Sequence, residues 1–207
     1  MANVAGPFGL VQIGTASGQP NFAQAGSGSP YRIASTYGTA IFFGDLVTLV
    51  AGSSPTGYIN QWIAGDGTAT YQAAGVFYGC KYYSTSQRKT VWNNYYPGSD
   101  ATGDVEAFVV DDPNAQFKIQ ANAGPLDLTT LGTTADVVVG SGNTTTGLSA
   151  MSLAAPSTSN PSYLPFKIVN VVTSPPGANG TDVTTAYNNV IVAFNNQIYK
   201  NLLTIHS

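Results

Sequence analysis

The chain has 207 residues and a net charge of −3, and only 8% of its residues are charged. It is long enough for one sizeable domain, and its charged fraction lies far below the roughly 25% of typical soluble proteins. The basic residues are scattered, which argues against a nucleic-acid binder, and no apolar run approaches the roughly 18 residues that span a bilayer. The single cysteine and single histidine exclude an internal disulfide framework and a histidine-based zinc site or triad within one chain.

The scarcity of charge points to a surface that lies against other proteins. A monomer of this mass exposes roughly 9,000 Å², which seven basic and ten acidic side chains cannot cover. Interface cores are poor in charge and rich in tyrosine, and the chain has twelve tyrosines. The sequence therefore favours an assembly protein, and the alternative is an extracellular or thermally robust β protein with an uncharged surface. The first ten residues lack a basic region and a long apolar core, so we expect no secretory signal.

Residues 1–30 are rich in glycine, alanine and serine, with isolated apolar residues between them. This composition predicts an extended N-terminal arm, and residues 25–30 are typical of a flexible hinge. The arm would either dock on a neighbouring subunit or form a disordered terminus. Its spaced apolar residues favour docking, and the predicted contacts are Phe8, Leu10 and Phe22. On this hypothesis, removal of residues 1–30 abolishes incorporation into an assembly.

Short strands separated by turns are predicted from Tyr31 onward. Apolar segments at Ala40–Phe43, Leu46–Val50 and Tyr58–Ile63 are bounded by glycine-containing turns. Ala74–Tyr83 and Thr90–Tyr96 form a predicted hairpin with a polar tip. Its aromatic residues could belong to a core, a protein interface or a platform for sugar. Those predicted to make interface contacts are Tyr82, Tyr83, Trp92, Tyr95 and Tyr96.

The stretch Val105–Gln120 is predicted to be a second hairpin. Residues 116–120 alternate between polar and apolar, as in a half-buried strand. Residues 112–115, Asp-Pro-Asn-Ala, fit a type I turn, because proline fixes the first central dihedral and the aspartate can bond the backbone beyond it. Asp111 and Asp112 are the only adjacent carboxylates in the chain, and turn chemistry explains them without catalysis.

The last third of the chain predicts one short helix and more strands. Pro125–Gly132 is the best helix candidate, with Asp127 as its cap. Ala135–Val139 is a predicted strand, and Pro165–Val172 with Asn189–Phe194 form a predicted strand pair.

These elements predict an all-β fold, namely a β-sandwich or barrel-like body of short antiparallel strands with at most one or two short helices. The expected organisation is the arm at 1–30, a single β-rich domain at 31–195 and a C-terminal tail at 196–207.

The sequence has no motif that predicts catalysis. Gly142–Ser149 has the spacing of a phosphate-binding loop, but Leu148 stands where the lysine is required. The acidic residues near Asp100, Asp104 and Glu106 could in principle form a calcium site or a glycosidase pair. Turn and loop chemistry explains them more simply. We therefore expect no catalytic residue, no metal and no cofactor, and no enzymatic activity.

Short segments spread over most of the chain share the pattern of one family. They are Ala2-Asn3 with Gly6–Leu10, Gly44-Asp45, Val110–Phe117, Ala135-Asp136 with Gly140–Met151, and the strand Val190–Asn195. With these segments the chain resembles a family of tailed-bacteriophage virion proteins that includes capsid decoration, or cement, proteins. The aromatic hairpin at residues 82–96 and the tail after Asn195 do not match the family pattern.

The resemblance implies a β-rich protein on the outer surface of an icosahedral capsid. Many copies would bridge adjacent major capsid protein subunits as dimers or trimers, without nucleic-acid or membrane partners. Burial of apolar and tyrosine surface across capsid seams would offset the outward pressure of packaged DNA. The alternatives are a tail-fibre or carbohydrate-binding β module that uses the same aromatic residues, and a hydrolase built on the acidic cluster.

Overall fold

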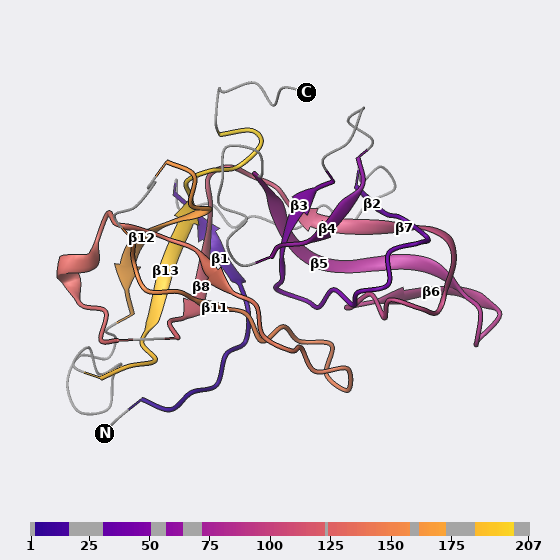
Figure 1. Cartoon of the computed structure of the whole chain (residues 1–207), viewed down its shortest axis with the longest axis horizontal. Coiled ribbons are helices and arrows are strands. Elements are labelled where there is room, and N and C mark those ends of the chain that lie inside the picture. Colours follow the sequence, from indigo (N-terminus) through magenta and orange to yellow (C-terminus); the bar gives the residue numbers. More distant parts are fainter. Residues whose placement is uncertain are drawn as a thin grey trace.

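The computed structural model describes residues 3–16, 31–50, 57–63, 72–122, 124–157, 162–172 and 185–200. Over these residues the fold is mainly β with antiparallel sheets, which confirms the predicted fold class (Figure 1). The elements are β1 (Val11–Thr15), β2 (Arg32–Ile33), β3 (Leu46–Leu49), β4 (Ile59–Gln61), β5 (Ala73–Ser84), β6 (Lys89–Asn93), β7 (Ala101–Val110), β8 (Ala115–Gln120), the 3-10 turn η1 (Leu128–Thr130), β9 (Thr134–Ala135), β10 (Val137–Val138), β11 (Ser152–Leu153), β12 (Phe166–Val171) and β13 (Asn189–Phe194).

One half of the molecule is a five-stranded sheet in the order β1-β8-β13-β12-β9. Strand β8, between β1 and β13, shows why the sequence alternates, because successive side chains of a strand point to opposite faces. Phe117 and Ile119 are fully buried, whereas Lys118 between them is only half-buried. The Phe117 ring packs against Phe194 of β13, with ring centroids 5.2 Å apart. This face of the sheet is therefore the core face.

The other half is a sheet in the order β2-β7-β5-β3-β4, which curls into a nearly closed barrel. The Arg32 amide of β2 donates to the Gly57 carbonyl at 2.9 Å, and a parallel bridge joins Arg32 to Tyr58 beside β4. The first and last strands of the sheet thus meet. Apolar side chains such as Phe77 and Ile59 fill the interior and are fully buried.

The turn after β7 joins the two halves, and here the predicted hairpin is wrong. The turn itself forms as predicted, because the Ala115 amide donates to the Asp112 carbonyl at 3.0 Å and the Asn114 amide donates to Asp112 Oδ1 at 2.8 Å. However, β7 pairs with β5 and β2, whereas β8 pairs with β1 and β13. Turn chemistry fixes the bend, while long-range pairing decides which sheet each strand enters. The chain leaves the barrel at this corner and enters the five-stranded sheet.

The described part of the predicted arm belongs to the body of the protein. Strand β1 pairs with β8, and the Leu10 amide donates to the Gly44 carbonyl at 2.9 Å. The Leu10 side chain is fully buried in the core of the five-stranded sheet, so its prediction as an interface contact is wrong. Phe8 is half-buried. Phe22 and residues 17–30 lie outside the described residues.

Two further predictions are confirmed, since β5 pairs with β6 as a hairpin and β12 pairs with β13. The predicted helix is the single 3-10 turn η1, which begins where Asp127 Oδ1 accepts the Thr129 amide at 2.8 Å. The predicted strand Ala135–Val139 is divided into β9 and β10 at Asp136. The Asp136 carboxylate accepts the Trp62 indole N–H at 2.9 Å, and its backbone carbonyl accepts the Ala154 amide at 2.9 Å. The strand is divided here because β9 pairs with β12, whereas β10 pairs with β11.

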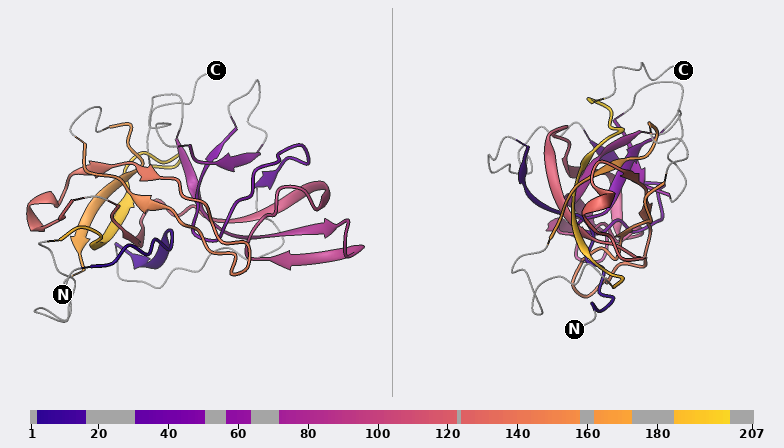
Figure 2. Two further views of the ribbon diagram at one scale, coloured as in Figure 1. Left: turned by 60° about the horizontal axis from the view of Figure 1, so that its bottom comes forward. Right: turned by 90° about the vertical axis from the view of Figure 1, so that its left-hand side faces the viewer.

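The described part of the predicted tail is also anchored. The Gln197 side chain is fully buried and donates to the carbonyls of Ala74, at 3.2 Å, and Asp111, at 3.0 Å. It therefore ties the end of the described chain to the barrel and to the corner between the two sheets. Figure 2 shows the two halves of the body from two further sides.

Candidate functional site

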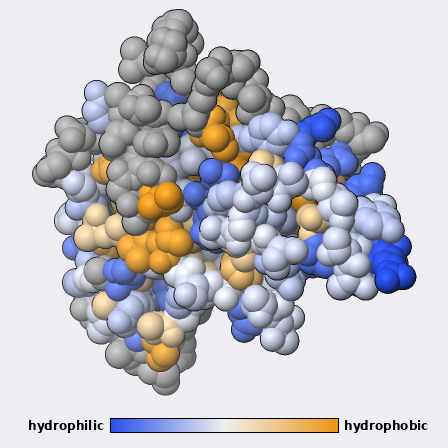
Figure 3. All heavy atoms as spheres, turned by 45° about the vertical axis from the view of Figure 1, so that its right-hand side comes forward, coloured by the Kyte–Doolittle hydropathy of each residue, from blue (hydrophilic) through white to orange (hydrophobic). Residues whose placement is uncertain are grey.

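The β5–β6 hairpin projects from the barrel and forms one end of the molecule (Figure 1). Strand β5 pairs with β3 near its start, from Ala73 to Val76, and with β6 from Cys80 to Ser84. Strand β6 therefore continues the line of β3 along the same side of β5. Figure 3 shows hydrophilic residues gathered at the projecting end and apolar residues elsewhere on the same face.

An acidic residue holds the base of the hairpin tip. The Asp100 carboxylate accepts hydrogen bonds from the Ser84 hydroxyl, the Thr85 hydroxyl at 2.9 Å and the Ser86 amide at 2.9 Å. Because these bonds stabilise the charged form, led by that from Ser84, they lower the pKa of Asp100 to about 2. Asp100 is therefore a structural anion.

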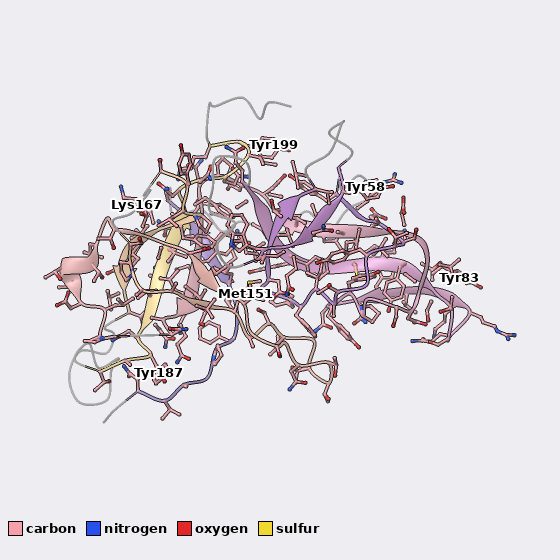
Figure 4. The ribbon with its side chains drawn as sticks, in the orientation of Figure 1. Tyr58, Tyr83, Met151, Lys167, Tyr187 and Tyr199 are labelled. Atoms are coloured by element: carbon pink, nitrogen blue, oxygen red, sulfur yellow. The ribbon has the colours of Figure 1, made fainter. Side chains whose placement is uncertain are left out.

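The inward side of the hairpin belongs to the barrel core. Tyr82 and Tyr96 are both buried there, so their prediction as interface contacts is wrong. The cause is the strand pleat, which turns Tyr82 inward and its neighbour Tyr83 outward. Tyr95 is half-buried and stacks on Phe42, with ring centroids 5.6 Å apart. Figure 4 shows Tyr83 at the projecting end, away from the five-stranded sheet.

The outward side presents an aromatic ledge, which we define as Trp92 with Phe108 beneath it. The two rings stack with centroids 5.2 Å apart and an interplanar angle of 6°. Trp92 comes from β6 and Phe108 from β7, on either side of β5. The β5 residue paired with Phe108 is Gly79. Trp92 nevertheless remains 63% exposed, which is a large exposure for an indole.

The Lys81–Glu106 ion pair lies beside this aromatic ledge. The Lys81 ammonium lies 5.1 Å from the centroid of the Trp92 ring and 3.8 Å from the Glu106 carboxylate. Lys81 pairs with Trp92 across one strand boundary and with Glu106 across the other, so the three residues form one row. The cation attracts the negative face of the indole. The indole orientation is thus set before any ligand arrives.

A shallow hollow of about 460 Å³ lies along β6, the strand that pairs only with β5 in the described structure. Its lining includes Trp92 but neither Phe108 nor Lys81. The lining residues are mostly polar and comprise Tyr82, Gln87, Lys89, Thr90, Val91, Trp92 and Asn93. Such a site can stack a ring on the indole and hydrogen-bond its polar substituents.

The other acidic residues are engaged in structural bonds. Asp104 accepts the hydroxyl of Tyr58 and the amide of Ser35, the latter at 3.2 Å. Glu106 is the ion-pair partner of Lys81. Within the described ranges no group of three or more metal-ligating side chains is suitably placed to hold a metal ion. This part of the chain also contains no helix with the length and apolar character needed to cross a membrane.

The segment with phosphate-loop spacing closes on itself. Asn143 Oδ1 accepts the Thr145 amide at 2.8 Å, and the Gly147 amide donates to the Asn143 carbonyl at 2.7 Å. A bridge between Asn143 and Leu148 completes the turn. The segment is therefore a loop tip stabilised by its own asparagine.

The free cysteine is also part of the barrel. Cys80 is fully buried, and its thiol donates to the Tyr95 carbonyl at 3.4 Å. Burial raises the pKa of the Cys80 thiol to about 12, which disfavours the nucleophilic thiolate.

Sequence reasoning identified Trp92 and Tyr83 but missed Phe108 and Lys81, which hold the indole. Trp92 and Phe108 are distant in sequence, and only the register of β6 and β7 against β5 brings them together. No local sequence pattern marks this contact, because Gly79 instead allows close approach of the Asn93 carbonyl.

Comparison of the chain with protein-family models, with curated proteins and with solved structures gave no match. The resemblance to capsid decoration proteins therefore stays a prediction.

Proposed function

We propose that this protein is a virion structural protein that decorates and stabilises the outside of an icosahedral phage capsid by bridging major capsid protein subunits. The observation that supports the proposal best is an apolar N-terminal edge, which we define as Val4, Phe8, Val11 and Ile13. Val11 and Ile13 lie on edge strand β1 and are 36% and 49% exposed. Exposed apolar side chains on an open sheet edge favour contact with another chain.

The residues around this N-terminal edge support the same role. The Phe8 ring lies 5.8 Å from the Lys118 ammonium, and Lys118 pairs with Val11, so a single cation is set among apolar side chains. A standard interface needs only about 1,600 Å² in total, and many copies repeat it over a shell. The proposal requires no cofactor, metal or catalytic residue, and it includes dimers or trimers of the protein on the outer capsid surface.

The test is incorporation of purified protein into expanded capsid shells that lack it. Removal of residues 1–30 is a poor test, because it would delete buried Leu10 and strand β1 together with the surface. The double variant V11T/I13T changes the edge while keeping β-branched residues. We expect it to reduce occupancy on shells at least tenfold.

The matched control is L148T, which alters a 42% exposed apolar residue on the 143–148 loop. It should bind shells like the unaltered protein. Full occupancy by V11T/I13T, or no binding of the unaltered protein to any shell, would reject the proposal.

The second candidate function is a carbohydrate-binding or tail-fibre β module. The exposed Trp92 ring beside a polar hollow favours it. A carbohydrate site and capsid binding are compatible, because the N-terminal edge and the hairpin are separate surfaces.

A further inference from the structure

We propose that the hollow beside Trp92 binds pyranose units of a polysaccharide. This activity goes beyond capsid decoration and does not depend on it. It also reassigns Trp92 from a protein contact to a carbohydrate contact. The argument uses the indole, the groups that hold it, and the polar residues beside it.

The indole is held by two neighbouring side chains and is still 63% exposed. Phe108 stacks on it at 5.2 Å and the Lys81 ammonium lies 5.1 Å from its centroid, while the hollow is lined by neither residue. The C–H groups on one face of a pyranose ring are electropositive, so they are attracted to the negative face of an aromatic ring. Because Phe108 and Lys81 already orient the indole, little side-chain entropy is lost on binding.

The polar residues beside the indole suit a ligand covered with hydroxyl groups. Gln87 offers an amide that both donates and accepts, and Thr90 offers a hydroxyl, whereas the Asn93 side chain is bonded to Tyr82. Sugar hydroxyls also donate and accept, so one pyranose ring can satisfy both Gln87 and Thr90. The core of a protein interface would instead require more apolar and aromatic surface than this lining provides. The composition therefore favours carbohydrate over a protein partner.

The size of the hollow agrees with a short stretch of oligosaccharide. Its volume of about 460 Å³ lies in the range of roughly 300–1,000 Å³ that is typical of small-ligand sites. The hollow is shallow and has one exposed indole, so we expect dissociation constants of about 0.1–1 mM for single chains. Many copies on one particle would bind a polysaccharide more tightly through avidity.

Tryptophan fluorescence gives a direct test, because the two tryptophans differ sharply. Trp62 is fully buried and bonded to Asp136, whereas Trp92 is exposed, so quenching by acrylamide reports mainly on Trp92. The probes are hexasaccharides of α-1,4-glucose, β-1,4-glucose, β-1,4-N-acetylglucosamine and α-1,4-galacturonate. We expect at least one probe to reduce the quenching constant at least twofold in a saturable manner.

Variants then localise the site by isothermal titration calorimetry. W92A should weaken binding of the same probe at least tenfold, and Q87A at least threefold. The matched control is L128A, because Leu128 is also 63% exposed and lies in η1, at the opposite end of the molecule (Figure 1). L128A should bind like the unaltered protein.

Two results would overturn the carbohydrate site: no probe binds at concentrations up to 5 mM, or W92A and Q87A, both folded by circular dichroism, bind as tightly as the unaltered protein. Neither result affects shell binding by the N-terminal edge. Conversely, V11T/I13T should retain oligosaccharide binding, so failure of one proposal is distinguishable from failure of the other.

Discussion

The Tyr31 hydroxyl donates to Asp111 Oδ2 at 3.0 Å, across the corner where the chain leaves the barrel. Asp111 and Asp112 thus have different roles, because Asp112 closes the turn and Asp111 anchors a buried tyrosine. Burial, more than the neighbouring carboxylate, raises the pKa of Tyr31, so the phenol stays a neutral donor. The bond between Tyr31 and Asp111 thus links the segment that begins at residue 31 to the turn between β7 and β8.

This contact predicts coupling between the two residues. Y31F removes the donor and D111N weakens the acceptor, so each should lower the free energy of unfolding by about 1–2 kcal/mol. In a double-mutant cycle followed by urea unfolding, we expect an interaction energy of about 0.5–1.5 kcal/mol. Y83F serves as the control, because Tyr83 is 47% exposed and lies at the projecting end of the molecule (Figure 4). Strict additivity of Y31F and D111N would contradict the assigned bond.

The buried carboxylate of Asp45 predicts a large stability effect. It accepts the Phe42 amide at 2.8 Å, the Gln61 side-chain amide at 2.7 Å and the Ser149 hydroxyl at 2.5 Å. D45A leaves these donors without an acceptor, and we expect a loss of about 3–4 kcal/mol, with a smaller loss for D45N. Chemical unfolding measures both values. A loss below about 1 kcal/mol for D45A would contradict a satisfied buried network.

The same residue predicts a pH dependence. Desolvation raises the pKa of Asp45 above its ordinary value of 3.8, although its hydrogen bonds act in the opposite direction. The folded state therefore holds the proton more tightly than the unfolded state. The stabilisation that protonated Asp45 gives the folded state is fully present below the unfolded-state pKa. It is lost as pH rises through the folded-state pKa. The stability of the unaltered protein relative to D45N should thus fall as pH rises from 3.8, then level off. A difference that grows with pH would contradict this sign.

Asp100 predicts the opposite pH dependence at the hairpin. The pKa of Asp100 is lowered from 3.8 to about 2. The stabilisation that its ionised carboxylate gives the folded state is therefore present above pH 3.8 and is lost as pH falls through about 2. Carboxyl carbon shifts followed by NMR should place its titration near that value. D100N should speed hydrogen exchange of the Ser86 amide, which Asp100 accepts at 2.9 Å, without unfolding the barrel. Unchanged exchange at Ser86 would show that the anion does not hold the tip.

Arg88 at the hairpin tip has a positive φ of 53°, a conformation that favours glycine. R88G should therefore raise the free energy of unfolding by about 0.5–1 kcal/mol, after allowance for the greater flexibility of glycine when unfolded. K89G, one residue later in β6, should instead destabilise, because it places glycine inside a strand. Thermal melts of the two variants provide the comparison. A lower melting temperature for R88G than for the unaltered protein would contradict the prediction.

Local patterns in the sequence predicted the features that depend on local chemistry. The turn at Asp112–Ala115, the β5–β6 hairpin and the cap at Asp127 follow from residues close together in the chain. Local patterns did not predict which strands pair with β7. The same turn can place the next strand beside β7 in a hairpin or direct it into another sheet. Long-range pairing made that choice.

The aromatic residues show the same division. Both Tyr82 and Tyr83 were predicted to make interface contacts, but neighbouring residues of a strand point to opposite sides and the barrel encloses Tyr82. The support of Trp92 by Phe108 depends on strand register across β5. The role of the buried Asp45 carboxylate was not predicted, since its partners Gln61 and Ser149 are distant in sequence. Contacts between distant residues therefore account for most of what sequence reasoning missed.

The bridge between Arg32 and Tyr58 gives the barrel a seam. A cylinder closed by so short a pairing has a preferred line of opening, whereas the long contact of β5 with β7 resists separation. Local opening there would expose the ends of β2 and β4 while the hairpin and the five-stranded sheet stay folded. We therefore expect the barrel to open first at this bridge, before β5 separates from β7.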